Sequence, residues 1–179
     1  FQTNSTYIVI TTLSLMLGVA SWIALRTISI PRKNLYLSSI TAIVLGGGGV
    51  LLLITQYVLV LSPWYSATMM IPLAGMIFAN CMNSISLAGE RLESEINNGK
   101  PYDKAKIIAL RTALIPITNS LLAVGLVSLP GMMTGQILSG VSPLIAVRYQ
   151  VMVMCMIFGS AGIASAVFLH LVEKDFYKR

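Results

Sequence analysis

Charged residues are scarce in this sequence. Only 10% of its 179 residues are Asp, Glu, Lys or Arg, whereas 56% are hydrophobic, and the mean hydropathy is +0.82. Soluble domains carry about 25% charged residues, and a soluble chain of this length could not bury so much apolar surface. The apolar runs are continuous rather than alternating, which favours helices over a barrel. The fold class indicated is an all-α, polytopic membrane protein.

Groups that do acid–base or metal chemistry are also few. The sequence has one histidine, His170, and none of its six acidic residues lies inside an apolar run. Paired catalytic carboxylates, zinc clusters and axial-histidine sites are therefore unsupported, so we expect neither an enzyme nor a cofactor in this chain. A proton-coupled carrier usually has an ionisable residue within the membrane. We therefore expect the energy for any transport to come from elsewhere.

A phosphate-binding loop is missing as well. The glycine run Gly46–Gly49 is followed by Val50 and two leucines, not by the Gly-Lys-Ser/Thr that such a loop requires. Close helix packing or a kink explains the glycines better. Any ATP hydrolysis must then occur on another polypeptide.

Five apolar segments have the length of about 20 residues that crosses a bilayer. The chain reads as one transmembrane domain, 1–179, with predicted spans over residues 7–25, 40–61, 66–88, 112–129 and 144–172. A polar arm, 90–111, separates the third and fourth spans. Within it Asn97–Pro101 predicts a break between helices, and Asp103 is expected to cap the next helix. Pro116 should kink that helix, and an irregular or re-entrant piece is expected around 130–143.

Basic residues are distributed unevenly between the predicted loops. Eleven of the twelve fall after the first, third and fifth spans, and Arg148 is the exception. The positive-inside rule then places the N-terminus outside and the C-terminus in the cytoplasm, with the polar arm also cytoplasmic. Lipid is the partner that this pattern indicates, and nucleic acid is not expected.

A few polar residues inside the spans suggest a path for substrate. Asn80 and Asn83 share one helical face because they are three apart. Asn119 follows the Pro116 kink, and Met132 and Met133 offer soft sulfur atoms. The alternatives are hydrogen bonding between helices for the asparagines and apolar filling for the methionines. The ligands of any metal remain unknown.

Several motifs resemble a known family. The matching residues are Ile71–Met76, Leu114–Pro116, Val124–Gly135, Ser139–Pro143 and Tyr149–Val153. They resemble the FetB-like (YbbM-like) ABC transporter permeases, a family that includes the plant aluminium-sensitivity membrane protein. The resemblance implies a permease that works as two copies with a separate ATP-binding subunit, in a bacterial inner membrane, a plasma membrane or an organelle membrane. It also implies metal export, such as iron export, or transport of a small solute. Family members usually have two more N-terminal helices, so we expect this chain to be incomplete there.

The resemblance gives the polar arm a role in coupling to the ATPase. Glu93 and Gly99 have the acid-to-glycine spacing of the docking loop of importer permeases, although Ser94 and Glu95 replace its alanines. We expect coupling through Glu93, Gly99, Lys104, Lys106 and Arg111. The alternatives are a solvated loop for the arm, and an ATP-independent oligomeric channel or a structural or assembly subunit for the chain.

Overall fold

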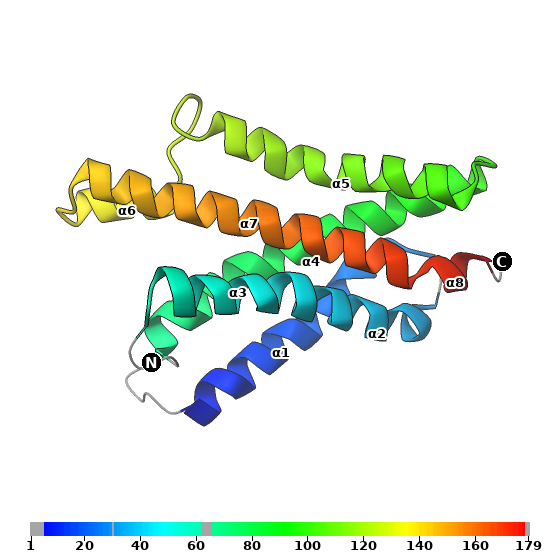
Figure 1. Cartoon of the computed structure of the whole chain (residues 1–179), viewed down its shortest axis with the longest axis horizontal. Helices are drawn as coiled ribbons and strands as arrows, with labels where there is room; N and C mark the ends of the chain where they lie inside the picture. Colours follow the sequence, from blue (N-terminus) through cyan, green and yellow to red (C-terminus); the bar gives the residue numbers. More distant parts are fainter. Residues whose placement is uncertain (1–5, 30, 62–65, 178–179) are drawn as a thin grey trace.

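The structure is a bundle of long helices that run roughly along one axis (Figure 1). It is a computed structural model that describes residues 6–29, 31–61 and 66–177, without the side chains of Arg32, Asn34 and Tyr177. Within these residues five helices are long and apolar enough to cross a membrane, and no strand occurs. The prediction of an all-α chain with about five membrane-spanning helices is confirmed.

Two long helices form the centre of the bundle. These are α4 (Ala67–Asn97) and α7 (Pro143–Leu171), which contact each other and most other elements. Helix α1 (Thr6–Ala24) packs on α4, and α5 (Tyr102–Ala123) packs on both α4 and α7. Small and apolar residues such as Ala74, Ile85 and Ala164 fill the central contact without any exposed surface.

The second crossing is a composite helix. It consists of α2 (Arg32–Ile43), the π-helical η1 (Val44–Gly48), α3 (Gly49–Leu53) and the π-helical η2 (Ile54–Val58). A Cβ atom on Gly46 would lie 2.5 Å from the backbone nitrogen of Ala164, and one on Gly47 would lie 3.0 Å from Ile77 Cγ2. Close helix packing, one of the two explanations expected for this glycine run, is therefore correct for its first half.

The stretch after α5 is more regular than expected. A tight turn over 124–128 leads to the short helix α6 (Gly131–Leu138), which packs on α7. Pro130 precedes α6 with its φ at −61°, and Gly140 ends it with its φ at +88°. Most of the piece predicted to be irregular is helical, because Pro130 sets the φ that starts a helix and Gly140 tolerates the left-handed conformation that ends one.

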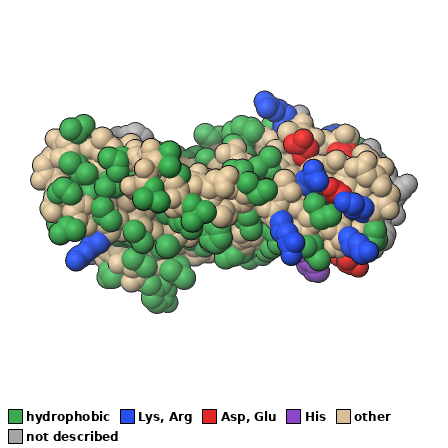
Figure 2. Space-filling model, turned by 90° about the horizontal axis from the view of Figure 1, so that it is seen from above, with side chains coloured by type: hydrophobic (Ala, Val, Ile, Leu, Met, Phe, Trp, Pro, Cys, Tyr) green, Lys and Arg blue, Asp and Glu red, His purple; other side chains and the backbone are tan. Residues whose placement is uncertain are grey.

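Charged side chains gather at one end of the molecule (Figure 2). The C-terminal helix α8 (Glu173–Tyr177), the α4–α5 connection and the α1–α2 connection lie at this end (Figure 1). We call it the charged end. The side chain of Arg32 and the residues Lys178 and Arg179, which the sequence assigns to the same side, lie outside the described part of the chain.

Candidate functional site

The α4–α5 connection is short and closely defined. Helix α4 ends in a Schellman motif, in which the Gly99 N–H donates to the Ile96 carbonyl (2.9 Å) and the Lys100 N–H to the Glu95 carbonyl (3.1 Å). Gly99 has a φ of +80°, a conformation that costs other residues energy. The predicted break at Asn97–Pro101 is present, and Gly99 has a structural role in it.

The start of α5 differs from the prediction. The helix begins at Tyr102 with Pro101 at the N-cap position, so the prediction that Asp103 caps it is wrong. Pro101 has an extended ψ of 147°, and its ring sets a φ of −63° from which the helix can begin one residue later. Asp103 instead lies in the first turn, where a negative charge is favourable.

Glu93 lies inside the charged end rather than on its surface. Its residue surface is 7% exposed, and its carboxylate accepts a hydrogen bond of 2.9 Å from the Ser29 N–H in the α1–α2 connection. Of the other residues predicted to couple to an ATPase, Lys104 and Arg111 are exposed and Lys106 is half-buried. Glu93 is thus buried and joins the α1–α2 connection to α4, whereas Lys104 and Arg111 lie at the surface.

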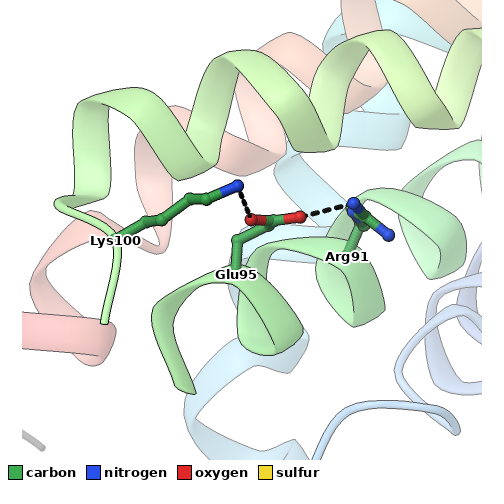
Figure 3. A network of polar contacts seen from close by, with 3 residues as sticks. All are labelled: Arg91, Glu95 and Lys100. Carbon is green, nitrogen blue, oxygen red and sulfur yellow. Dashed lines mark ion pairs between the residues drawn. The ribbon is translucent and has the colours of Figure 1, made fainter. Parts of the chain in front are cut away.

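A second buried carboxylate closes the α4–α5 connection (Figure 3). Glu95 forms ion pairs of 2.5 Å with both Arg91 and Lys100, and its side chain is 4% exposed. The hydrogen bond from Lys100 and the charge of Arg91 hold the pKa of the Glu95 carboxyl below its ordinary value, against the opposing effect of burial. We call this trio the clasp. The burial of the clasp was not expected from the sequence, although the spacing of four residues between Arg91 and Glu95 predicts an ion pair on one helical face.

A third bond ties α5 to α7. The hydroxyl of Tyr102, which is buried, donates to the Leu169 carbonyl near the end of α7. Together with the Glu93–Ser29 bond and the clasp, it links three segments that are far apart in the sequence. These contacts hold the segments of the charged end to one another.

The polar residues of α4 border a small cavity between α4, α5 and α7. The cavity has a volume of about 100 Å³. Its polar lining comes from Asn80, Asn83, Ser84 and Ser120. Asn119, Met132 and Met133, the other predicted path residues, do not line it; Met133 is buried on α6.

The cavity lining combines polar and apolar side chains and carries no charge. Asn80 donates a hydrogen bond of 2.8 Å to the Met76 carbonyl in its own helix, and Ser84 lies 2.7 Å from the Ser165 hydroxyl of α7. No cluster of three or more His, Cys, Asp or Glu residues that could hold a metal occurs among the described residues. The cavity can solvate a polar solute through amide and hydroxyl groups, and its lining has no carboxylate.

Comparison with known proteins identifies the family. The model of the uncharacterised protein family UPF0014 matches residues 1–108 and 100–177. The chain belongs to this family. This UPF0014 chain is 34% identical over 202 aligned positions to a UPF0014 membrane protein of Synechocystis, covering 100% of the chain and 75% of the relative. The family resemblance that the sequence motifs indicated is confirmed.

Two further relatives have names that refer to a metal. The chain is 36% identical to the probable iron export permease protein FetB of Escherichia coli, over 79% of the chain and 60% of the relative. It is 32% identical to the protein ALUMINUM SENSITIVE 3 of Arabidopsis thaliana, over 99% of the chain and 69% of the relative. No solved structure matches the chain. The UPF0014 chain is an integral membrane protein with several membrane-spanning helices.

Proposed function

We propose that this chain is the membrane subunit of an ABC transporter that exports a metal ion such as iron, or a small solute, and is driven by a separate ATP-binding subunit. The similarity to the probable iron export permease of Escherichia coli, over 79% of the chain, carries the proposal. A second copy of the chain completes the transporter. The glycine run of the chain is followed by Val50 and cannot form a phosphate-binding loop, so ATP is hydrolysed on the partner.

The uncharged cavity on α4 supports a path for a hydrated substrate. Its volume of about 100 Å³ is large enough to hold water. Asn80 and Asn83 supply amide groups there, and Ser84 supplies a hydroxyl group. A metal ion would pass with water or its own ligands as its inner shell, because the lining has no carboxylate to replace them. Asn119, Met132 and Met133 belong to this path only if another conformation brings them to it.

The decisive experiment is purification of the chain in a mild detergent followed by an ATPase assay of the complex. We expect an ATP-binding protein to copurify and its ATPase activity to rise in the presence of the exported substrate. Iron(II) and a panel of other divalent ions are the first additives to assay. Recovery of a lone oligomer that conducts ions without ATP would favour the channel, and a lone oligomer without flux would favour the assembly subunit.

A substitution in the cavity tests the path. Asn80→Leu should lower ATP-dependent flux in reconstituted vesicles while the complex still assembles. The matched control is Thr41→Val, because the Thr41 hydroxyl likewise bonds a carbonyl of its own helix, that of Leu37 at 2.8 Å, but lies outside the cavity lining. Equal flux in the two variants would remove Asn80 from the path.

A further inference from the structure

A second cavity lies between α4 and α5, closer to the charged end than the cavity that Asn80 lines. It has a volume of about 170 Å³, and its lining consists of Leu87, Glu90, Arg91, Ser94 and Thr112. Glu90, Arg91 and Ser94 are exposed, so this cavity opens to the surface. None of the residues predicted from the sequence to carry substrate or to couple to an ATPase lines it. We call it the vestibule, and we call the first cavity the asparagine cavity.

The two cavities follow one another along the same pair of helices. On α4 the asparagine cavity is lined from Asn80 to Leu87, and the vestibule from Leu87 to Ser94. Steps of three or four residues along this series keep the lining on one face of α4. Positions 80 and 94 are 14 residues apart, which is roughly 21 Å of α-helix and about two-thirds of the hydrocarbon thickness of a bilayer. One face of α4 thus leads from the interior of the bundle to the surface at the charged end.

Leu87 is the one described residue that lines both cavities. The lining on α5 changes at the same level, because Thr112 borders the vestibule and the next residue, Ala113, borders the asparagine cavity. Leu87 is half-buried and apolar. Apolar constrictions close pores to water and ions, since a hydrated ion finds no polar group to replace its water there. Leu87 is therefore placed to act as an apolar barrier between the two cavities.

The charges that line the vestibule are not equivalent. Glu90 is the only acidic residue among the described residues that line the two cavities, and it forms no ion pair within the described part of the chain. Arg91 is directed to Glu95, from which it lies 2.5 Å away in the clasp (Figure 3). The positive charge of Arg91 is thus held by a buried carboxylate, whereas the charge of Glu90 has no fixed partner. A confined space next to such a carboxylate concentrates positively charged solutes.

We propose that the vestibule binds a hydrated divalent cation at the charged-end mouth of the substrate path, with Glu90 selecting positive charge and Leu87 separating this site from the asparagine cavity. The proposal rests on the proposed function. The carboxylate of Glu90 and the hydroxyl groups of Ser94 and Thr112 are hard oxygen ligands, which suit a divalent ion that keeps several of its water molecules. A single carboxylate holds such an ion weakly, so the ion can leave again, as transport requires.

Thiol labelling of the purified chain tests the charge preference without transport or a partner. Thr112→Cys is introduced into a Cys155→Ala background, in which the remaining Cys81 is buried. We expect a cationic methanethiosulfonate reagent to react at position 112 several-fold faster than an anionic one, after correction for their rates with a free thiol. Glu90→Gln should lower this ratio several-fold. Asp103→Asn is the matched control, because Asp103 is an exposed acid on α5 that does not line the vestibule.

Flux in vesicles that contain the assembled complex supplies the second readout. Glu90→Gln should raise several-fold the concentration of iron(II) that gives half-maximal ATP-dependent flux, and Glu90→Asp should restore most of the wild-type behaviour. Leu87→Ala should increase the leak of the ion in the absence of ATP, because it removes the apolar barrier. Leu122→Ala, at a 68% exposed position of α5 outside both linings, should leave the leak unchanged.

Equal labelling ratios in Glu90→Gln and Asp103→Asn would overturn the role of Glu90. Faster labelling by the anionic reagent in Thr112→Cys would also overturn it, because the basic residues of the charged end would then set the charge preference. A wild-type leak in Leu87→Ala would show that this side chain is no barrier. Absence of ATP-dependent flux from the wild type would contradict the proposed function, whereas the labelling ratio would still decide whether the vestibule attracts cations.

Discussion

The two ends of the bundle satisfy their polar groups in different ways. At the charged end, Glu93 bonds Ser29 and Tyr102 bonds Leu169, so each bond joins residues more than 60 positions apart. At the opposite end, around α6, the side-chain hydrogen bonds in the described structure stay local: the hydroxyls of Thr134 and Ser139 each bond a carbonyl four residues earlier. One end is held by bonds between elements, whereas the bonds at the other stay within single helices, and the buried Gln136 Oε1 there has no hydrogen-bond partner in the described structure.

Because of this difference, the two ends should resist movement of their helices to different degrees. A braced end transmits force, because its connections cannot shift independently without breaking buried polar contacts. Where each helix satisfies its own polar groups, neighbouring helices can slide at the expense of packing alone. The charged end is therefore the part of the described structure whose connections are held to one another, and the helices around α6 depend on packing alone to stay in place.

The largest expected effect comes from removing the acid that joins α1–α2 to α4. Glu93→Ala should lower the free energy of unfolding by about 1.5–3 kcal/mol, because it deletes a hydrogen bond to a charged group. Thermal unfolding in detergent measures it. Glu93→Gln, which keeps an acceptor oxygen, should recover part of the loss. Unchanged stability in Glu93→Ala would break the comparison, since the charged end would then owe nothing to this bond.

The bond between α5 and α7 should have a smaller effect. Tyr102→Phe removes only the hydroxyl that donates to Leu169 and should cost about 0.5–1.5 kcal/mol. The matched control is Tyr57→Phe, because Tyr57 is 83% exposed. The same unfolding assay applies, and equal stability of the two variants would argue against a brace at this position.

The clasp should open in acid. The pKa of Glu95 is depressed in the folded state, so its ion pairs stabilise the connection at neutral pH. They are lost as the pH falls below the ordinary value of about 4.5 towards the lower folded-state pKa. We expect proteolysis over 98–101 to become several-fold faster in Glu95→Gln at pH 7. In the wild type we expect the amides there to lose protection at low pH, measured relative to their intrinsic exchange rate at each pH. Glu90→Gln, at an exposed position, should behave like the wild type. A connection that exchanges equally fast in Glu95→Gln and wild type would show that the turn alone holds it.

The smallest effect is expected at the opposite end. Leu126 is 88% exposed in the turn after α5, so Leu126→Ala should change the free energy of unfolding of the isolated chain by no more than about 0.5 kcal/mol. The same variant should be tested in the oligomer that the proposed function requires. Destabilisation of the oligomer alone would sharpen the comparison, because it would place a second copy against this turn.

Much of the fold could be predicted because apolar runs and helix-breaking residues can be recognised in short stretches of sequence. The break at Asn97–Pro101 follows from residue type alone, and residue type gave close packing as one of two explanations for Gly46. The spacing of Asn80 and Asn83 predicted a shared helical face, and both residues line the cavity on α4. These features need no knowledge of the remainder of the chain.

The burial of acids within the polar arm could not be predicted in this way. The partner of Glu93 is a backbone N–H 64 residues away, and no local pattern identifies it. Composition describes the arm as polar and exposed, whereas tertiary contacts decide which charges face inward. The start of α5 at Tyr102 depends on the extended backbone of Pro101. Residue type alone does not reveal that conformation, so the sequence placed the cap at Asp103 instead.

The second crossing contains two wide turns, Val44–Gly48 and Ile54–Val58. A wide turn of this type holds more residues than an α-helical one, and such turns are frequent at functional sites. If one of them tightened to ordinary α geometry, the register would slip by one residue, and everything beyond it would rotate by about 100° around the helix axis. Gly46 packs closely against Ala164, and Leu51 and Ile54 beyond it are buried. The two wide turns therefore set which face of the outer half of this crossing packs against the bundle.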